Sequence, residues 1–212
     1  MLTRGFRRHA LTVSGPSDAQ EIPPTAVLEL EDGAALKFAD WPDAGIPRRA
    51  AGVYTIWRQE NLLYAGMSGR GAKAELFTLS SEGKRAGLWT RLNSHASGRR
   101  SGDQFNVYIC DRFVVPALTQ DQQQAIASGQ LLLDRMTRDF IRQNLTYRYL
   151  VCQDGTVALK VERSIRAGQL PAGRPYLNPL LRPPHSTSTA SSPRPSGTPA
   201  RSSPRTGGCG VR

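Results

Sequence analysis

The sequence predicts an α+β domain, built on a small, mainly antiparallel three-stranded sheet flanked by helices, with a disordered C-terminal tail. With 39% hydrophobic and 21% charged residues in 212, the chain can bury a core of its own. Short β-branched and aromatic runs occupy its middle, and amphipathic helical patterns follow them. Residues 182–212 consist almost entirely of Pro, Ser, Thr, Gly, Ala and Arg, a composition typical of disorder.

Composition divides the chain into three segments. Residues 1–46 have a net charge of −3, residues 47–181 of +9, and residues 182–212 of +5. We expect the first segment to add a strand at 27–30 or 36–38, or to cap the domain as an arm. The middle segment is the predicted domain, and the last is the predicted tail.

The middle segment begins with a hairpin pattern. Residues 53–57 (VYTIW) and 62–66 (LLYAG) are apolar runs separated by a polar turn, which predicts two paired strands. A glycine-containing loop follows. A helix is expected over residues 86–96, where Leu88, Leu92 and His95 share one face.

Later elements are predicted in the same way. Alternation in residues 104–114 (QFNVYICDRFV) predicts the third strand. A capping-box pattern at Thr119 begins a helical stretch that reaches about Asn144, with Gly129 as its point of interruption. A short strand is expected over residues 147–152. A final helix is expected from 156 to 167.

Composition also limits the classes of function. No apolar run approaches the roughly 18 residues needed to cross a bilayer, which excludes an integral membrane protein. The three cysteines are too widely spaced for a disulfide framework or a zinc knuckle. We therefore expect a cytoplasmic protein. Its net charge of +11 favours a polyanionic partner, with nucleic acid first and an anionic membrane surface second.

The remaining candidate site is a set of residues that lie far apart in the chain but occur in a definite order. The tripeptides 52–54 (GVY) and 64–66 (YAG) fall on the two hairpin strands. Arg91 and His95 follow, four residues apart on one predicted helix, and Glu162 lies on a later helix. Hydrolysis needs a base for the attacking water and positive charge beside the phosphate. These residues can supply both.

In this order the residues resemble the signature of the GIY-YIG nuclease family. The resemblance covers about residues 48–180 and includes Asn178, which resembles the family's trailing asparagine. It implies an endonuclease that cleaves DNA, and a dimer would allow such an enzyme to cut both strands. We expect Arg70, Lys73, Arg85 and Asn178 to contact the nucleic acid.

The resemblance also implies roles for the signature residues. Tyr54 is the implied general base, and Arg91 together with a divalent metal would lower its phenol pKa. Glu162 is the implied ligand of one Mg²⁺ or Mn²⁺ ion. Arg91 would neutralise the charge that develops on the phosphate. Tyr64 and His95 would orient the water or the scissile phosphate.

Two other functions remain open from the sequence. The chain could be a nucleic-acid-binding module that has the same fold without turnover. It could also be a partner-binding structural protein whose positive charge reflects codon usage, since 24 of its 28 basic residues are arginine. Taken singly, strand tyrosines are usually sheet aromatics, and an Arg–His pair on a helix is usually a solvated face.

Overall fold

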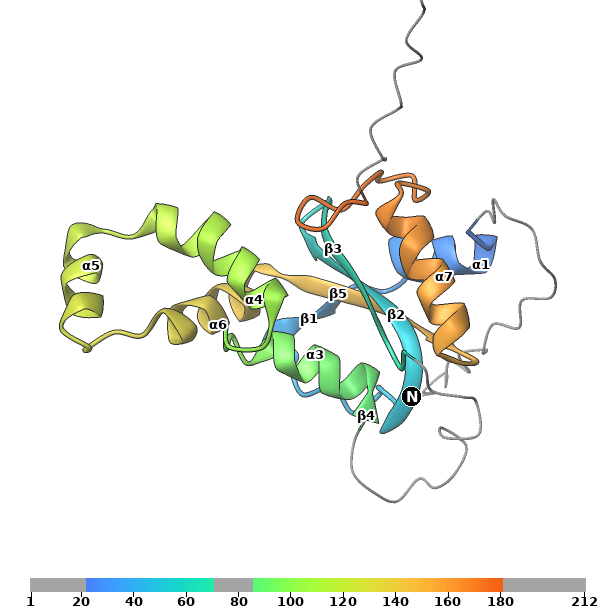
Figure 1. Cartoon of the computed structure of the whole chain (residues 1–212), viewed down its shortest axis with the longest axis horizontal. Coiled ribbons are helices and arrows are strands. Elements are labelled where there is room, and N and C mark those ends of the chain that lie inside the picture. The colour runs from blue at the N-terminus through green and yellow to red at the C-terminus, as the bar shows by residue number, and fades with distance from the viewer. Residues whose placement is uncertain (1–21, 71–85, 181–212) are drawn as a thin grey trace, which may run out of the picture. The chain divides into compact units, whose positions relative to one another are not determined.

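A computed structural model of the chain describes residues 22–70 and 86–180, and Figure 1 shows their arrangement. The described residues belong to one compact unit that ends at Leu181. The predicted tail, residues 182–212, lies outside them. The strands are β1 (Leu36–Lys37), β2 (Arg49–Arg58), β3 (Asn61–Ser68), β4 (Ala86–Gly87) and β5 (Thr146–Cys152). The α-helices are α1 (Pro24–Val27), α3 (Leu88–Ala96), α4 (Gln104–Ile109), α5 (Gln120–Ala127), α6 (Leu133–Asn144) and α7 (Gly155–Arg166).

The α+β class is confirmed, but the sheet is larger than the three strands predicted. Its strands follow the order β1-β5-β2-β3, and every neighbouring pair is antiparallel. The short β4 adds a parallel pairing to the start of β2. The long β2 therefore lies at the centre of the sheet, paired on both sides.

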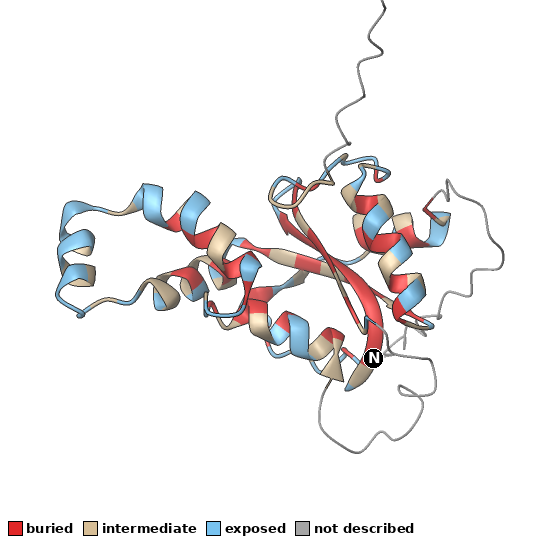
Figure 2. Cartoon of the chain, viewed as in Figure 1, coloured by how far each residue is buried: buried red, intermediate tan, exposed pale blue. Residues whose placement is uncertain are grey.

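Helices cover both faces of this sheet. Successive side chains of a strand point to opposite faces, so Tyr54 and Ile56 of β2 join one buried cluster while Val53 and Trp57 join another. The first cluster is completed from α3, α4 and α6, and the second from α1 and α7. Figure 2 shows the buried residues concentrated along β2 and β3 and on the helix faces that meet the sheet.

The strand predicted over residues 104–114 is wrong, because this segment is helical. It forms α4 and continues as a π-helical turn, Cys110–Val114. Asp103 caps it by accepting a hydrogen bond from the Phe105 amide at 3.1 Å. Buried positions 105, 106, 109, 110 and 114 follow a helical spacing, so the apolar alternation did not mark the buried face.

The other predicted elements agree closely with the structure. The hairpin, the helix at α3, the strand at β5 and the final helix at α7 all form. Gly129, with a φ of +76°, separates α5 from α6 at the expected interruption. The α5 helix has no buried residue, and Figure 2 shows it exposed or intermediate throughout. None of the described helices is long and apolar enough to cross a bilayer.

The described part of the first segment packs onto the sheet. Residues 27–30, one of the two alternative strand positions, are helical, whereas Leu36 and Lys37 pair with β5 as the other alternative predicted. Ile22, Ala26 and Leu30 join the cluster beneath α7.

A buried threonine joins this segment to the central strand. The Thr55 hydroxyl donates to the Leu30 carbonyl at 2.7 Å and accepts from the Trp57 indole at 2.8 Å. The one hydroxyl therefore ties the Leu30 backbone and the Trp57 side chain to the same point of β2.

The residues after α7 return along the outer edge of β3. The amides of Tyr176 and Leu177 donate to the carbonyls of Leu62 and Leu63, at 3.0 and 2.8 Å. This segment therefore covers an edge of the sheet that no other described strand pairs.

Replacing Thr55 with the isosteric valine should destabilise the domain by about 1–3 kcal/mol, because it removes both buried hydrogen bonds of the hydroxyl and leaves the Trp57 indole without this acceptor. Thr137→Val in α6 is the matched control. Thr137 is also buried, but its hydroxyl only donates to the Leu133 carbonyl one turn earlier, which also accepts in the backbone ladder of α6, so this change should cost less than Thr55→Val. Urea unfolding measures both values, and equal losses would contradict the assignment.

Candidate active site

Strand pairing brings the two signature tripeptides together. Tyr54 of β2 lies directly opposite Gly66 of β3. A Cβ atom at Gly66 would collide with the ring and hydroxyl of Tyr54, so only glycine leaves room for that phenol. At Gly52, a Cβ atom would collide with the Leu150 carbonyl and with Leu88 of α3. The glycines thus allow the phenol and the helix to approach the sheet closely.

Four of the five predicted catalytic residues line one cavity of about 1030 Å³. Tyr54 and Tyr64 come from the hairpin, Arg91 from α3 and Glu162 from α7. Arg70, expected to contact nucleic acid, also lines it. Residues more than 100 positions apart in the chain therefore meet at one open site. The remaining lining residues are Arg49, Gly66, Met67, Ser68, Gly69, Ala86, Gly87, Thr90 and Ser94.

His95 lies behind Tyr54 rather than in the wall of the cavity. The Tyr54 hydroxyl and His95 Nε2 are 2.7 Å apart, and both residues are only 1% exposed. On the other side of the ring, His95 Nδ1 lies 2.8 and 3.0 Å from the two carboxylate oxygens of Asp103. Ser94 also donates its hydroxyl to Asp103 at 2.7 Å. A buried Tyr–His–Asp chain therefore begins at the cavity.

The surroundings of Tyr54, His95 and Asp103 determine which of these side chains carries each proton. Burial lowers the pKa of His95 below 6.5, outweighing the hydrogen bond to Asp103 that raises it. Although burial raises the pKa of Asp103, hydrogen bonds from His95 and Ser94 bring it below its ordinary value. An ionised Asp103 can only accept, so His95 Nδ1 carries the proton. Nε2 of the neutral ring then accepts from the Tyr54 hydroxyl.

The Tyr54 phenol is harder to ionise than expected. Burial raises its pKa well above 10, and Tyr64 raises it further. Arg91 lowers the pKa as predicted, but by less than burial raises it. Without a bound metal or substrate, the Tyr54 phenol is therefore neutral at neutral pH and acts as a hydrogen-bond donor.

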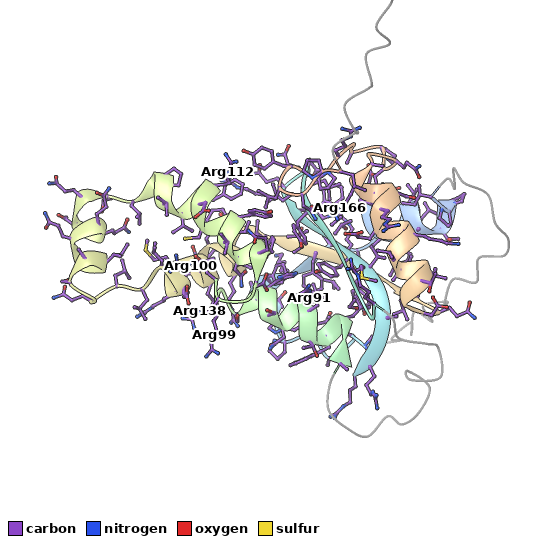
Figure 3. The ribbon with its side chains drawn as sticks, in the orientation of Figure 1. Arg91, Arg99, Arg100, Arg112, Arg138 and Arg166 are labelled. Atoms are coloured by element: carbon purple, nitrogen blue, oxygen red, sulfur yellow. The ribbon has the colours of Figure 1, made fainter. Side chains whose placement is uncertain are left out.

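Arg91 is exposed on α3, one helical turn before His95 (Figure 3). It forms no ion pair with any residue that the structure describes. The guanidinium can therefore meet an anion that enters the cavity.

Glu162 is 7% exposed and lies beside Arg166, whose Nη1 donates to its Oε1 at 3.0 Å. Within ranges 22–70 and 86–180, no group of three or more His, Cys, Asp or Glu side chains could enclose a metal ion. One carboxylate in an open cavity fits Mg²⁺ or Mn²⁺ that keeps most of its water ligands. Glu162 is the cavity residue that fits such an ion.

Asn178, expected to contact nucleic acid, does not line this cavity and is instead bonded to the backbone of β3. Its Oδ1 accepts from the Ala65 amide at 3.1 Å, and its Nδ2 donates to the Ala65 carbonyl at 2.7 Å. Its own carbonyl accepts from Arg166 Nε at 2.9 Å. Asn178 therefore links β3 to the arginine that holds Glu162. Lys73 and Arg85, also expected to contact nucleic acid, lie outside the described residues.

Sequence reasoning missed Asp103 and Arg166. A helix cap directly before residue 104 would have pointed to Asp103, but the segment after it was interpreted as a strand. Arg166 follows Glu162 by four residues on one helix, a spacing that favours an ion pair.

No family model matches the chain, and comparisons with curated proteins and with solved structures give no match either. The resemblance to the GIY-YIG family therefore rests on the residues named above.

Asn178→Ala should destabilise the protein by about 1–3 kcal/mol, because it leaves both backbone groups of Ala65 without their side-chain partner. Asn178→Asp should cost at least as much, since a carboxylate oxygen would then face the Ala65 carbonyl. Asn144→Ala is the control, because that exposed amide bonds only Phe140 in its own helix. Thermal unfolding compares the three, and a loss at Asn178 no greater than at Asn144 would refute the link.

Asp103→Asn should lower the pKa of His95 further and reduce its Nδ1–H tautomer, because the carboxylate that raises this pKa is lost. Asparagine can still cap α4. Asp154→Asn is the matched control, since Asp154 caps α7 in the same way without a histidine. Imidazole ¹⁵N NMR across a pH titration measures both quantities. The assignment fails if His95 carries its proton on Nε2 in the unmodified protein.

Proposed function

We propose that the chain is a divalent-metal-dependent endonuclease that hydrolyses phosphodiester bonds of DNA. The observation that carries the proposal is the buried Tyr54–His95–Asp103 chain, which opens into a cavity shared with Arg91 and Glu162. A base, a cation and a carboxylate for a metal are the groups that this hydrolysis needs.

The Tyr54–His95–Asp103 hydrogen bonds would allow Tyr54 to act as a base without first ionising to a phenolate. Because burial raises the pKa of Tyr54, the phenol alone would rarely be ionised at neutral pH. As Tyr54 accepts a proton from the attacking water, it can release its own to His95 Nε2 over 2.7 Å. Asp103 then stabilises the imidazolium, the role of the aspartate in a Ser-His-Asp triad.

The other cavity residues act on the phosphate. Arg91 would pair with a non-bridging oxygen as negative charge builds there. Tyr64, stacked against Tyr54 with ring centroids 6.4 Å apart, would orient the water or the phosphate. Glu162 would hold Mg²⁺ or Mn²⁺, which when bound supplies further positive charge at the phosphate. Arg166 and Asn178 keep Glu162 in place.

The charge of the domain supports a nucleic-acid substrate. Residues 47–181 have a net charge of +9, and the cavity is lined by Arg49, Arg70 and Arg91 against the single carboxylate of Glu162. Such a surface attracts a polyanion and brings its backbone toward the site.

Tyr54→Phe and Glu162→Gln should each slow the Mg²⁺-dependent nicking of supercoiled plasmid by about 100-fold or more, since one removes the base and the other the metal ligand. The matched controls Tyr108→Phe and Glu60→Gln remove the same groups away from the cavity and should leave the rate unchanged.

EDTA should abolish nicking by the unmodified protein. Equal nicking by Tyr54→Phe and the unmodified protein would refute the role of Tyr54. If the purified unmodified protein binds DNA and never nicks it, the chain is a binding module instead of an enzyme.

A further inference from the structure

A second cavity, of about 610 Å³, lies beside α3 and α6 and carries three arginines. Arg99 follows the end of α3, while Arg138 and Arg142 stand one turn apart on α6. None of the residues that line this cavity is acidic. Its other walls include neutral hydrogen-bonding side chains such as Ser97 and Ser101. Positive charge with neutral polar neighbours is an environment suited to phosphate.

The second cavity adjoins the candidate active site. Thr90 and Ser94 of α3 line both cavities, so the two meet across this helix. Figure 3 shows Arg91 on α3 and places Arg99 close to Arg138. The nine residues of α3 span about 14 Å, and one DNA strand rises about 3.4 Å per nucleotide. The helix therefore spans about four nucleotides.

The three arginines are available to an anion. Arg99 is exposed and, like Arg142, has no ion pair with the described residues. Arg142 Nε is buried without a hydrogen-bond partner among them, which is costly for a guanidinium N–H.

Among the described residues, one ion pair involves these arginines, and it is weak. Arg138 lies 3.6 Å from Asp139, and the two side chains are 44% and 48% exposed. Exposed pairs of this kind contribute little stability, so a phosphate can replace the carboxylate. By contrast, Arg100 is held by Asp134 at 2.7 Å and does not line the cavity.

We propose that Arg99, Arg138 and Arg142 bind the phosphate backbone of duplex DNA a few nucleotides from the bond that is cut. The identity of the ligand as DNA rests on the proposed function. Arginine suits this role because its planar fork of donors matches two phosphate oxygens. Because the second cavity and the active-site cavity share Thr90 and Ser94 in their walls, one extended polyanion could reach both, whereas a small isolated anion could occupy only one.

The test is equilibrium binding of a fluorescently labelled DNA duplex, measured by anisotropy in EDTA so that no cleavage occurs. Arg99→Gln/Arg138→Gln should bind about ten-fold more weakly at 0.15 M salt. The slope of log affinity against log salt should fall in magnitude by about 1.8, or about 0.9 per lost phosphate contact.

Arg112→Gln/Arg163→Gln is the matched control. It removes the same charge from two exposed arginines that line neither cavity, and Figure 3 shows Arg112 well apart from Arg99 and Arg138. Its slope should stay close to that of the unmodified protein. Equal slopes for the two double variants would overturn the proposal. If Arg99→Gln/Arg138→Gln unfolds, Arg99→Gln alone should still lower the magnitude of the salt slope by about 0.9. An unchanged slope in that single variant would overturn the proposal.

The outcome separates this proposal from the endonuclease proposal. If the protein binds DNA through these arginines but never nicks plasmid, the phosphate-site proposal holds and the endonuclease proposal fails. If the protein nicks plasmid but the two double variants have equal slopes, the endonuclease proposal holds and the phosphate-site proposal fails. If the unmodified protein does not bind duplex DNA, both fail.

Discussion

The hydrogen bond between Tyr54 and His95 is the contact on which the candidate site depends. It joins the central strand of the sheet to α3, and Asp103 extends it to the start of α4. The bond forms only because Gly66, opposite Tyr54, leaves room for the phenol. The contacts of the site therefore join three elements of the fold, β2, α3 and α4, and α3 also carries Arg91.

Burying three titratable side chains is tolerable only because each has a partner. Leaving the hydroxyl, the imidazole and the carboxylate buried without hydrogen bonds would lower the free energy of unfolding by several kcal/mol in total. Tyr54 donates to His95, His95 donates to Asp103, and Asp103 also accepts from Ser94 and the Phe105 amide. The network is thus complete in its hydrogen bonds, and it would supply the proton transfer that the proposed hydrolysis needs. A purely structural core at this position would be served as well by apolar side chains.

The parts of the fold and site that could be predicted are those determined by local patterns. The hairpin and α3 follow from periodicity, and the order of signature residues identified Tyr54 and Arg91 of the cavity. The strand prediction for residues 104–114 was wrong because their apolar alternation is typical of a strand, whereas the adjacent Asp103 caps a helix. The partners of Asn178 could not be predicted, since they depend on how a segment without regular structure returns to β3.

That returning segment has a consequence for the protein in solution. Strand β3 ends the described sheet, and an open strand edge is a template for pairing with another chain. The amides of Tyr176 and Leu177 bond the carbonyls of Leu62 and Leu63, and the side chain of Asn178 bonds both backbone groups of Ala65. The segment that fixes Glu162 through Arg166 thereby also leaves fewer backbone groups on this edge to pair with a second chain.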